Sequence, residues 1–435
     1  MSTVNSPLIP DRTQQTSLGD VTDHTDPASP ESERWNQPRA NVPKVSAVFW
    51  SFLIMGANDT AYGPLLLYLE SYYSVSYTVV SFLFLSPVCG YILAAVLNDK
   101  VHNRLGRRGA AWISASNHLI GHFFTSLHPP YPILVAVFAL QGFANGLADS
   151  GYNAWVVNMA NANQLLGIMH GLYGFGAVLS PLIATSLVTK ANLPWYYFYY
   201  IMTACAMIEL VICLGAFRDL DAASFRADNQ TEEQSDGNMS RAIAQPPYSR
   251  ITWICAFFLV GYMGVEVALG GWIVTYMIQV RHGEAFASGM VATGFWLGIS
   301  CGRIVLGFFT PLLKEELAIV VYSLLSIACG FILWLVPYFS ASAVAVAVLG
   351  FFLGPFFPAT VIVATRILPR ALHVSAIGFA SAIGGTGAAI LPFAVGAIAQ
   401  RHGVQVLPPI IIVLISGILS LWLFLLEISK TILRV

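Results

Sequence analysis

Long apolar runs, interrupted by short polar or charged stretches, dominate the chain from Lys44 onward. A helix that crosses the hydrocarbon core of a bilayer, about 30 Å thick, needs about 20 apolar residues. Runs of that length are separated into two groups of six by one long polar stretch. The predicted spans are 45–70, 77–98, 109–127, 132–158, 164–189, 195–217, 251–279, 286–309, 316–337, 341–366, 372–399 and 406–429. The pattern therefore predicts an all-α integral membrane protein with twelve transmembrane helices.

Polar segments divide the chain around these spans. Residues 1–44 are rich in Ser, Thr, Pro and Asp and contain no apolar run, so we expect a disordered tail without a cleavable signal peptide. Residues 218–250 are polar and acidic, which indicates a flexible linker. The predicted domains are two six-helix bundles, 45–217 and 251–429, joined by this linker and followed by a short tail, 430–435.

Lys and Arg are distributed unevenly between the two ends of the spans. If the first span begins in the cytosol, 16 of the 21 basic residues lie near cytosolic span ends, and only Lys190, Arg281 and Arg401 lie on the other side. Cytosolic loops normally carry this excess. We therefore expect both termini and the linker in the cytosol. The plasma membrane is the favoured location, with the vacuolar membrane as the alternative.

Composition and motifs narrow the classes of function. The chain is 56% hydrophobic and 10% charged, whereas soluble domains contain about 25% charged residues. Its net charge of −1 gives no reason to expect a nucleic acid partner. The six cysteines lie in apolar runs without metal-type spacing, and the sequence contains neither a phosphate-binding loop nor a zinc-protease or hydrolase motif. We expect no enzyme, no cofactor and no metal; the expected partners are the lipid bilayer, a small solute and protons.

The two halves share three motifs in the same order and at nearly one offset. The matched stretches are GFANG at Gly142 and GFFLG at Gly350, GFGAVLSP at Gly174 and GTGAAILP at Gly385, and the acid-x-x-x-Gly pairs Asp59/Gly63 and Glu266/Gly270. These repeats indicate two pseudo-symmetric bundles. In transporters, this arrangement places the substrate site between the halves near the membrane midplane.

Small residues four apart also indicate where helices approach closely. Glycines at this spacing let membrane helices pack with short backbone distances. The pairs are Gly142/Gly146, Gly167/Gly171, Gly298/Gly302 and Gly350/Gly354. We predict helix packing as the role of all four pairs.

Four acidic residues lie well inside predicted spans, away from the span ends: Asp59, Asp149, Glu209 and Glu266. An Asp at the centre of a span costs about 2.5 to 3.5 kcal/mol on insertion scales, so such residues normally face a cavity or a partner. Desolvation disfavours the charged form of a carboxyl group, which lets the group load and release a proton. We predict Asp59, Asp149 and Glu266 as proton-coupling or substrate-binding residues. Glu209 lies on a span without other polar residues, which favours a structural role.

Polar and aromatic side chains near these acids complete a predicted substrate cavity. Asn145, Asp149 and Asn153 are spaced i, i+4, i+8 and form a polar stripe on one helical face. Aromatic rings with a few polar groups are the usual lining of sites for organic ligands. Besides the three acids, the predicted cavity residues are Asn58, Asn145, Asn153, His170, Tyr262, Trp272, Trp296 and Arg303.

Several of these residues also have a purely structural interpretation. The acids could pair with Arg303 or with helix ends and only hold helices together. Arg303 could bind a substrate anion or pair with Glu266, and both alternatives stay open. His118 and His122, four residues apart, could bind a metal, but two ligands alone are weak support for a metal site. For His170, a packed, hydrogen-bonded histidine is favoured over one that titrates near neutrality.

The six-plus-six plan, the linker and a basic loop after the second span resemble the major facilitator superfamily from Lys44 to Lys430. Further motifs resemble its fucose permease-like branch, including fungal members of the bypass-of-stop-codon type. These motifs are Asn58-Asp59, Asp149 with Asn153, HGLYGFGA, GFWLGISCGR, GVEVALGGWIVTYMI and GFANGLADSGYNAW. The resemblance implies that the acids of spans 1 and 4, here Asp59 and Asp149, act in proton coupling and substrate binding.

The sequence departs from the family pattern in the gating loop and in spans 4, 5 and 11. The superfamily loop G-x-x-x-D-R-x-G-R-R is matched as NRLGRRG, either with Asn103 in the place of the acid or with the acid, Asp99, displaced four residues upstream. The predicted residues of this gating loop are Asp99, Arg104, Gly106, Arg107 and Arg108. Span 4 carries Asp where the sugar symporters have Glu, and spans 5 and 11 offer almost no Asn or Gln for sugar hydroxyls. Fungal members include exporters of specialised metabolites, and the aromatic residues of spans 7 and 8 suit a less polar cargo.

The sequence thus predicts a monomeric secondary transporter with the two-bundle fold of this superfamily. It would move a small organic solute by alternating access, coupled to protons. Export of a specialised metabolite is slightly favoured over proton-coupled sugar import. The alternative from another class is a non-transporting membrane sensor of the same fold. Such a sensor usually has a long cytosolic extension, which we do not expect here.

Overall fold

A computed structural model describes residues 33–228, 235–369 and 372–433. Most of the predicted tail and part of the linker lie outside these ranges. The first half contains α1 (Asn41–Thr60), α2 (Tyr62–Tyr73), α3 (Tyr77–Val80), α4 (Phe82–Ser126), α5 (Tyr131–Val156), α6 (Ala162–Thr189) and α7 (Tyr197–Ala216). The linker contains α8 (Ala222–Asp228) and α9 (Ser235–Ala244). The second half contains α10 (Tyr248–Gln279), α11 (Ala285–Leu313), α12 (Glu315–Leu335), α13 (Phe339–Leu353), α14 (Phe356–Ile367), α15 (His373–His402), the short η3 (Val404–Val406) and α16 (Leu407–Leu433).

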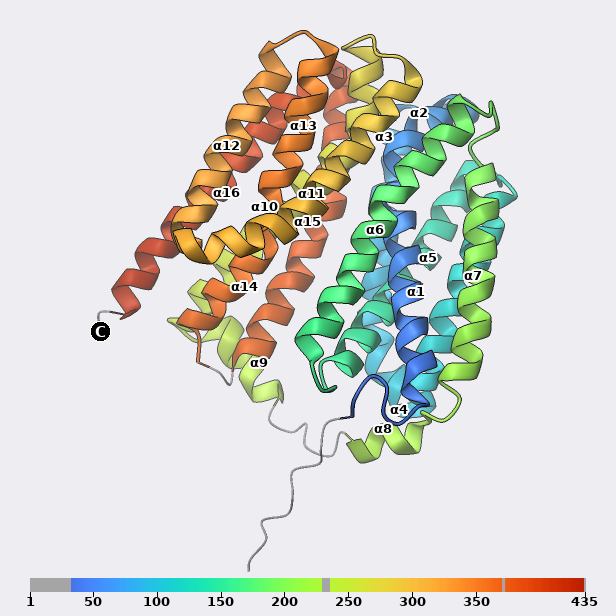
Figure 1. Cartoon of the computed structure of the whole chain (residues 1–435), viewed down its shortest axis with the longest axis vertical. Helices are drawn as coiled ribbons and strands as arrows, with labels where there is room; N and C mark the ends of the chain where they lie inside the picture. Colours follow the sequence, from blue (N-terminus) through green and yellow to red (C-terminus); the bar gives the residue numbers. More distant parts are fainter. Residues whose placement is uncertain (1–32, 229–234, 370–371, 434–435) are drawn as a thin grey trace, which may run out of the picture.

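The helices form two bundles that repeat one packing pattern (Figure 1). In the first bundle α1 packs against α6 and α4 against α5; in the second, the corresponding pairs are α10 with α15 and α11 with α13. The sequence repeats fall on these matching helices, since Gly142 and Gly350 lie on α5 and α13, and Gly174 and Gly385 lie on α6 and α15. The prediction of two pseudo-symmetric bundles in an all-α membrane protein is confirmed.

Ten helices in the described residues are long and apolar enough to cross a membrane. Two features explain why ten such helices are found where twelve spans are predicted. Spans 2 and 3 lie in one continuous element, α4, which bends at Gly106, and span 1 is divided between α1 and the shorter α2. The architecture is therefore consistent with twelve crossings.

The division of the first span follows from a proline. Pro64 has no backbone N–H, so the carbonyl of Thr60 loses its usual helical donor. The hydroxyl of Thr60 lies within hydrogen-bond distance of two carbonyls, that of Gly56 at 3.0 Å and that of Ala177 on α6 at 3.1 Å. The irregular turn at Ala61 thus lies two residues after Asp59 and is fastened to a neighbouring helix.

The close glycine packing predicted from sequence is confirmed at three of the four pairs. A Cβ on Gly142 would overlap Pro87 of α4, and the glycines of α11 and α13 contact each other's helices in the same way. At Gly167 and Gly171 of α6 the prediction is wrong, because no atom lies within 4 Å of where a Cβ would be. These two glycines lie near the end of the bundle at which both halves begin, described below as the linker end.

Contacts between the halves lie mainly toward the opposite end, near α2 and α3 (Figure 1). The hydroxyl of Tyr77 donates to Oε1 of Gln279 at 2.7 Å, and its backbone N–H donates to Oε1 of Gln400 at 2.8 Å. A Cβ on Gly289 would overlap Thr185 of α6. Toward the linker end, Gly378 and Gly385 of α15 have no neighbour within 4 Å of a Cβ position, as at Gly167 and Gly171. The two bundles are therefore closed against each other at the end opposite the linker.

Candidate functional site

The carboxylate of Asp59 is half-buried beside the irregular turn of the first span. Its Oδ1 accepts hydrogen bonds from Asn145 on α5 and Asn58 on α1, each at 3.3 Å, and its Oδ2 accepts one from the hydroxyl of Tyr173 on α6 at 3.0 Å. All three donors are neutral side chains. Asp59 therefore connects three helices of the first bundle without a direct cationic partner among these contacts.

A second polar group on the same bundle contains Asp149. Asn153 donates to Oδ1 of Asp149 at 2.8 Å, and Nε2 of His170 on α6 lies 3.2 Å from Oδ1 of Asn153. Asp149 and Asn153 are half-buried and His170 is exposed. The structure thus brings three of the predicted cavity residues together where the bundle is not covered by the other half.

Asn145 belongs to the predicted stripe but turns away from this group. Its side chain is 3% exposed, and it contacts Asp59 and Nε2 of His118. It therefore lies inside the first bundle, between two titratable side chains.

Arg303 and Glu266 form an ion pair on the second half. Nη2 of Arg303 lies 3.1 Å from Oε1 of Glu266 and donates to the hydroxyl of Tyr262 at 3.0 Å. The side chain of Arg303 is 34% exposed, so part of the guanidinium is accessible. Arg303 also lies within electrostatic range of His170 and Tyr173 on the first half. Of the two alternatives for Arg303, pairing with Glu266 is what the structure contains, and the pair faces the polar groups of the first bundle.

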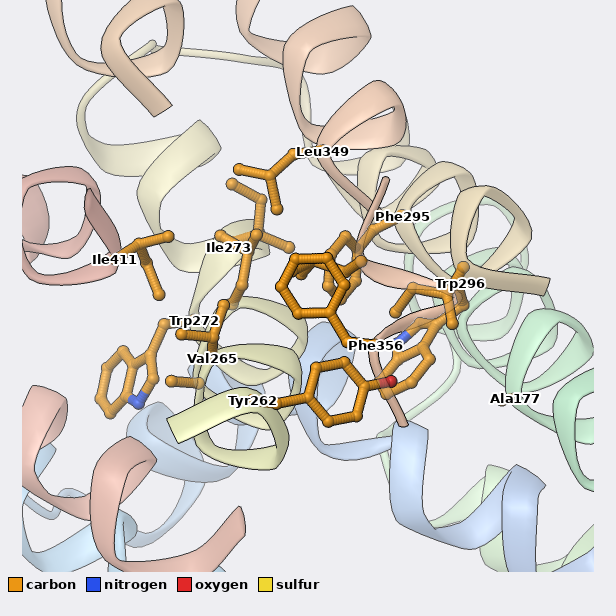
Figure 2. Packing of buried hydrophobic residues seen from close by; sticks show 14 of the residues in the cluster. Ala177, Tyr262, Val265, Trp272, Ile273, Phe295, Trp296, Leu349, Phe356 and Ile411 are labelled. Atoms are coloured by element: carbon orange, nitrogen blue, oxygen red, sulfur yellow. The ribbon is translucent and has the colours of Figure 1, made fainter. Parts of the chain in front are cut away.

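The aromatic residues predicted to line the cavity are largely packed in the core (Figure 2). Tyr262, Trp272 and Trp296 are at most 7% exposed. Trp272 does not join the site: its indole N–H donates to the carbonyl of Pro392 at 2.9 Å, and its ring packs against Tyr77. Within the described residues, Nε1 of Trp296 and Oδ1 of Asn58 are buried without a hydrogen-bond partner.

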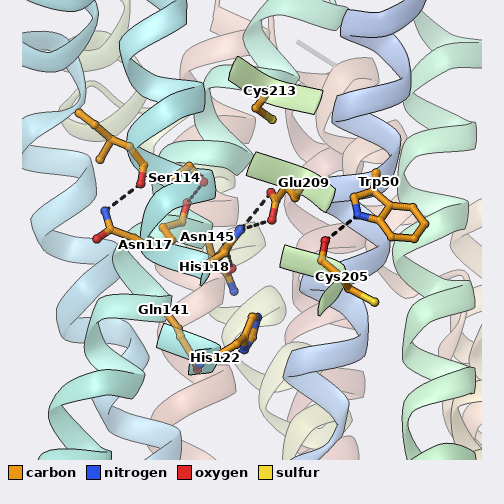
Figure 3. Close-up of polar contacts among 12 residues, drawn as sticks. Trp50, Ser114, Asn117, His118, His122, Gln141, Asn145, Cys205, Glu209 and Cys213 are labelled. Carbon is orange, nitrogen blue, oxygen red and sulfur yellow. Dashed lines mark hydrogen bonds and ion pairs between the residues drawn. The ribbon is translucent and has the colours of Figure 1, made fainter. Parts of the chain in front are cut away.

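A contact that the sequence did not predict links Glu209 to His118 (Figure 3). Both carboxylate oxygens of Glu209 on α7 lie 3.0 Å from Nδ1 of His118 on α4, and both side chains are buried. His122 instead contacts Nε2 of Gln141 at 3.1 Å. The two histidines therefore have separate partners, and in the described ranges no group of three or more potential metal ligands is present. Tyr173 was also missed as a site residue, because a tyrosine in an apolar span carries no distinctive spacing.

The predicted gating loop forms the bend of α4 and receives the linker helix α8. Gly106 has φ +72°, and a Cβ there would overlap Asp221 at the start of α8. The backbone N–H of Arg108 donates to the carbonyl of Leu220 at 2.8 Å, and the guanidinium of Arg107 lies 5.6 Å from the ring centre of Phe225. Asp99 and Arg104 are exposed. The loop is thus tied to the linker, while its acid and one of its arginines face outward.

Comparisons with known proteins agree with this architecture. The family model described as Major Facilitator Superfamily matches residues 48–349. Bypass of stop codon protein 6 of Saccharomyces cerevisiae is 29% identical over 392 residues, which cover 84% of this chain and 78% of that protein. A glucose/mannose transporter of Bacillus subtilis is 24% identical over 272 residues, which cover 61% of this chain and 65% of that protein. The crystal structure of a D-xylose-proton symporter superposes with a TM-score of 0.69 at 13% identity, covering 88% of this chain and 97% of that one.

The family model covers more than half of the chain, and the fold is that of solved transporters. Neither the family nor these structural neighbours are enzymes. The chain therefore belongs to the Major Facilitator Superfamily and is a membrane transporter of small solutes.

Proposed function

We propose that this transporter couples the movement of a small polar solute to protons, and that Asp59 and Asp149 carry or sense the proton. The observation that carries this proposal is the surroundings of Asp59, whose hydrogen-bond donors Asn58, Asn145 and Tyr173 are all neutral. A carboxyl group without a direct cationic partner inside a membrane protein is more easily protonated than an ion-paired one. The basic side chains around the site already have acidic partners, since Arg303 is paired with Glu266 and His118 with Glu209.

The contacts between the halves support a mechanism of alternating access. They hold the bundles together at Tyr77 and Gly289, at the end opposite the linker, whereas His170 remains exposed between the halves. The distribution of Lys and Arg places the linker end in the cytosol. We therefore assign this state as inward-facing, closed to the outside, with Asp149 and His170 reachable from the cytosol. Rocking of the two bundles about the acids would expose the same groups to the other side.

The groups that face the space between the halves support a polar cargo. The expectation of a less polar solute depended on Tyr262, Trp272 and Trp296, which are packed in the core. The groups left for a ligand are carboxylates, amides, the imidazole of His170 and the accessible part of Arg303, which suit hydroxyl groups. The glucose/mannose transporter among the relatives supports the same class. We therefore favour a sugar-like solute, with export of a specialised metabolite as the second candidate.

The test is solute-driven proton movement in proteoliposomes that contain the purified full-length protein. D-glucose, D-mannose and D-xylose would be the first probes, with a pH-sensitive dye enclosed. We expect a solute-dependent pH change in the wild type that is lost in Asp59→Asn and Asp149→Asn. Glu70→Gln serves as the matched control, because Glu70 is an acid of α2 near the closed end, away from the site, and it should retain the signal.

Three results would contradict the proposal in different ways. Solute uptake without a pH change, equal in wild type and both variants, would indicate a uniporter or another coupling ion. A signal with organic extracts of the source organism but with none of the sugars would favour the exporter. Binding of solute without net movement across the bilayer would favour a sensor of the same fold.

A further inference from the structure

A buried chain of polar side chains connects four helices of the first bundle and ends at Asp59. Its members are Glu209 on α7, His118 on α4, Asn145 on α5 and Asp59 on α1. Figure 3 shows its first three members, Glu209, His118 and Asn145. Glu209 lies 3.0 Å from Nδ1 of His118, Nε2 of His118 lies 2.8 Å from Oδ1 of Asn145, and Nδ2 of Asn145 lies 3.3 Å from Asp59. Glu209 and His118 are at most 1% exposed, so the part of the chain farthest from Asp59 is sealed from solvent.

The two carboxylates fix the direction of every hydrogen bond in this chain. An ionised carboxylate only accepts, so Glu209 requires a hydrogen on Nδ1 of His118. Asp59 in its carboxylate form likewise requires the N–H₂ group of Asn145, which leaves Oδ1 of Asn145 facing His118. Nε2 of His118 must then also carry a hydrogen. With both acids ionised, His118 is an imidazolium that Glu209 neutralises.

We propose that Glu209 and His118 are positioning residues, which hold the amide of Asn145 with its N–H₂ group toward Asp59 and so favour the carboxylate form of Asp59. This inference rests on the proposed function, in which Asp59 takes up and releases a proton. Glu209 and His118 do not touch the solute in this account. They act on Asp59 through the orientation of one amide.

Removing the charge of Glu209 would reverse the direction of the hydrogen bonds between His118, Asn145 and Asp59. In Glu209→Gln the imidazole no longer needs two hydrogens, and its bare Nε2 accepts from Asn145. The amide then turns its oxygen toward Asp59, where it repels a carboxylate and accepts a hydrogen from the protonated acid. The substitution thus changes the proton affinity of Asp59 without touching it.

Other titratable groups also face Asp59 and have to remain unchanged in the test. His118 and Tyr91 face it from α4, Asp149 from α5 and Tyr173 from α6. Tyr62 on α2 and Tyr199 on α7 are also within electrostatic range. None of these residues is substituted in Glu209→Gln, but His118 loses its positive charge there, and this charge lies within electrostatic range of Asp59. The double variant with Asn145→Ala separates the two effects, because without the amide only the lost charge can still act on Asp59.

The experiment is an infrared pH titration of the protonated-carboxyl band in lipid nanodiscs, with no solute present. The band that Asp59→Asn removes reports Asp59. Losing a hydrogen bond to a charged group changes an equilibrium about tenfold or more, so we expect the midpoint of this band to rise by about one pH unit in Glu209→Gln. His118→Gln should give the same shift, because glutamine can donate to Glu209 and accept from Asn145.

His122→Gln is the matched control, since His122 is a buried histidine one turn away whose ring stacks on that of His118 and whose hydrogen bond goes to Gln141 of α5, outside this chain. Its midpoint should equal that of the wild type. Asn145→Ala by itself should raise the midpoint of the Asp59 band. Adding Glu209→Gln to Asn145→Ala should raise the midpoint no further, because Glu209 acts on Asp59 through Asn145.

The outcomes separate this inference from the proposed function. If Asp59→Asn removes no titrating band, Asp59 does not exchange a proton and the proposed coupling fails. If the band titrates but Glu209→Gln and His118→Gln leave its midpoint unchanged, the positioning role is wrong. Should those two variants fail to fold, Asn145→Ala decides, since an unchanged midpoint there also overturns the inference.

Discussion

Gly63 on α2 and Gly270 on α10 face each other across the two halves so closely that a Cβ on Gly63 would overlap the carbonyl oxygen of Gly270. The two glycines occupy equivalent places in the internal repeat, each four residues after an acid, Asp59 or Glu266. The repeat therefore brings its own two copies into contact where the halves are closed.

This contact predicts that Gly63→Ala weakens the closed end. Overpacking typically costs about 1 to 3 kcal/mol, which would shift the population toward states that are open opposite the linker. The measurement is labelling of Thr185→Cys with a membrane-impermeant maleimide, in a background without the six native cysteines; Thr185 is 2% exposed and packs against Gly289 across the halves. Labelling should be faster in Gly63→Ala than with Gly63 intact. Gly417→Ala, whose Cβ would have no neighbour within 4 Å, is the control, and equal rates in all three proteins would refute the prediction.

The ion pair between Glu266 and Arg303 predicts a non-additive effect on stability. Breaking a buried pair costs about 3 to 5 kcal/mol when one charge remains unpaired. Arg303→Met should therefore be strongly destabilising, because the side chain of Glu266 is only 11% exposed. Glu266→Gln should cost less, since Arg303 is 34% exposed and water screens its charge. The double variant should melt above Arg303→Met in detergent; strictly additive losses would mean that the pair contributes no coupling.

Asp221, between α7 and α8, predicts a pH dependence of the linker contact. Its carboxylate accepts the backbone N–H groups of Ser224 at 3.0 Å and Ala223 at 3.1 Å, and these bonds lower the pKa of Asp221 from 3.8. A carboxyl group with a lowered pKa in the folded state stabilises the fold fully above its unfolded value. The contribution is lost as the pH falls through the folded pKa.

We therefore expect Asp221→Ala to lower the melting temperature at pH 6. The difference from wild type should begin to shrink as the pH falls below about 3.8 and vanish below the lowered pKa of folded Asp221. The control is Asp219→Ala, because Asp219 forms an exposed ion pair with Arg218, and its substitution should change the melting temperature little at any pH. A difference for Asp221→Ala that persists unchanged at pH 3 would show that another interaction is involved.

The fold followed from the sequence because hydrophobic run length and glycine spacing are local properties. The irregular turn of the first span lies next to Pro64, and the bend of α4 lies within the predicted gating loop. The linker helices α8 and α9 were not predicted, because their composition is polar and their contacts are tertiary.

The site was predicted only in part, for reasons of helix geometry. Residues four apart differ by about 40° around a helix, so Asn145 and Asn153 point about 80° apart despite sharing a stripe. Asn145 therefore enters the bundle, whereas Asn153 faces His170. The pairing of His118 with Glu209 joins residues 91 positions apart, which no spacing rule detects. Aromatic residues in an apolar span likewise give no sign of whether they face a cavity or the core, as Trp272 illustrates.

The bare helix surface at Gly167, Gly171, Gly378 and Gly385 bears on the energy balance between states. At the linker end these four glycines have no neighbour at their Cβ positions, whereas at the opposite end Gly63 and Gly289 pack closely against the other half. A conformer that closed the linker end could gain packing on the first set while giving up the second. Such an exchange would leave the two conformers close in free energy, so that small changes, such as one proton or one bound solute, suffice to select between them.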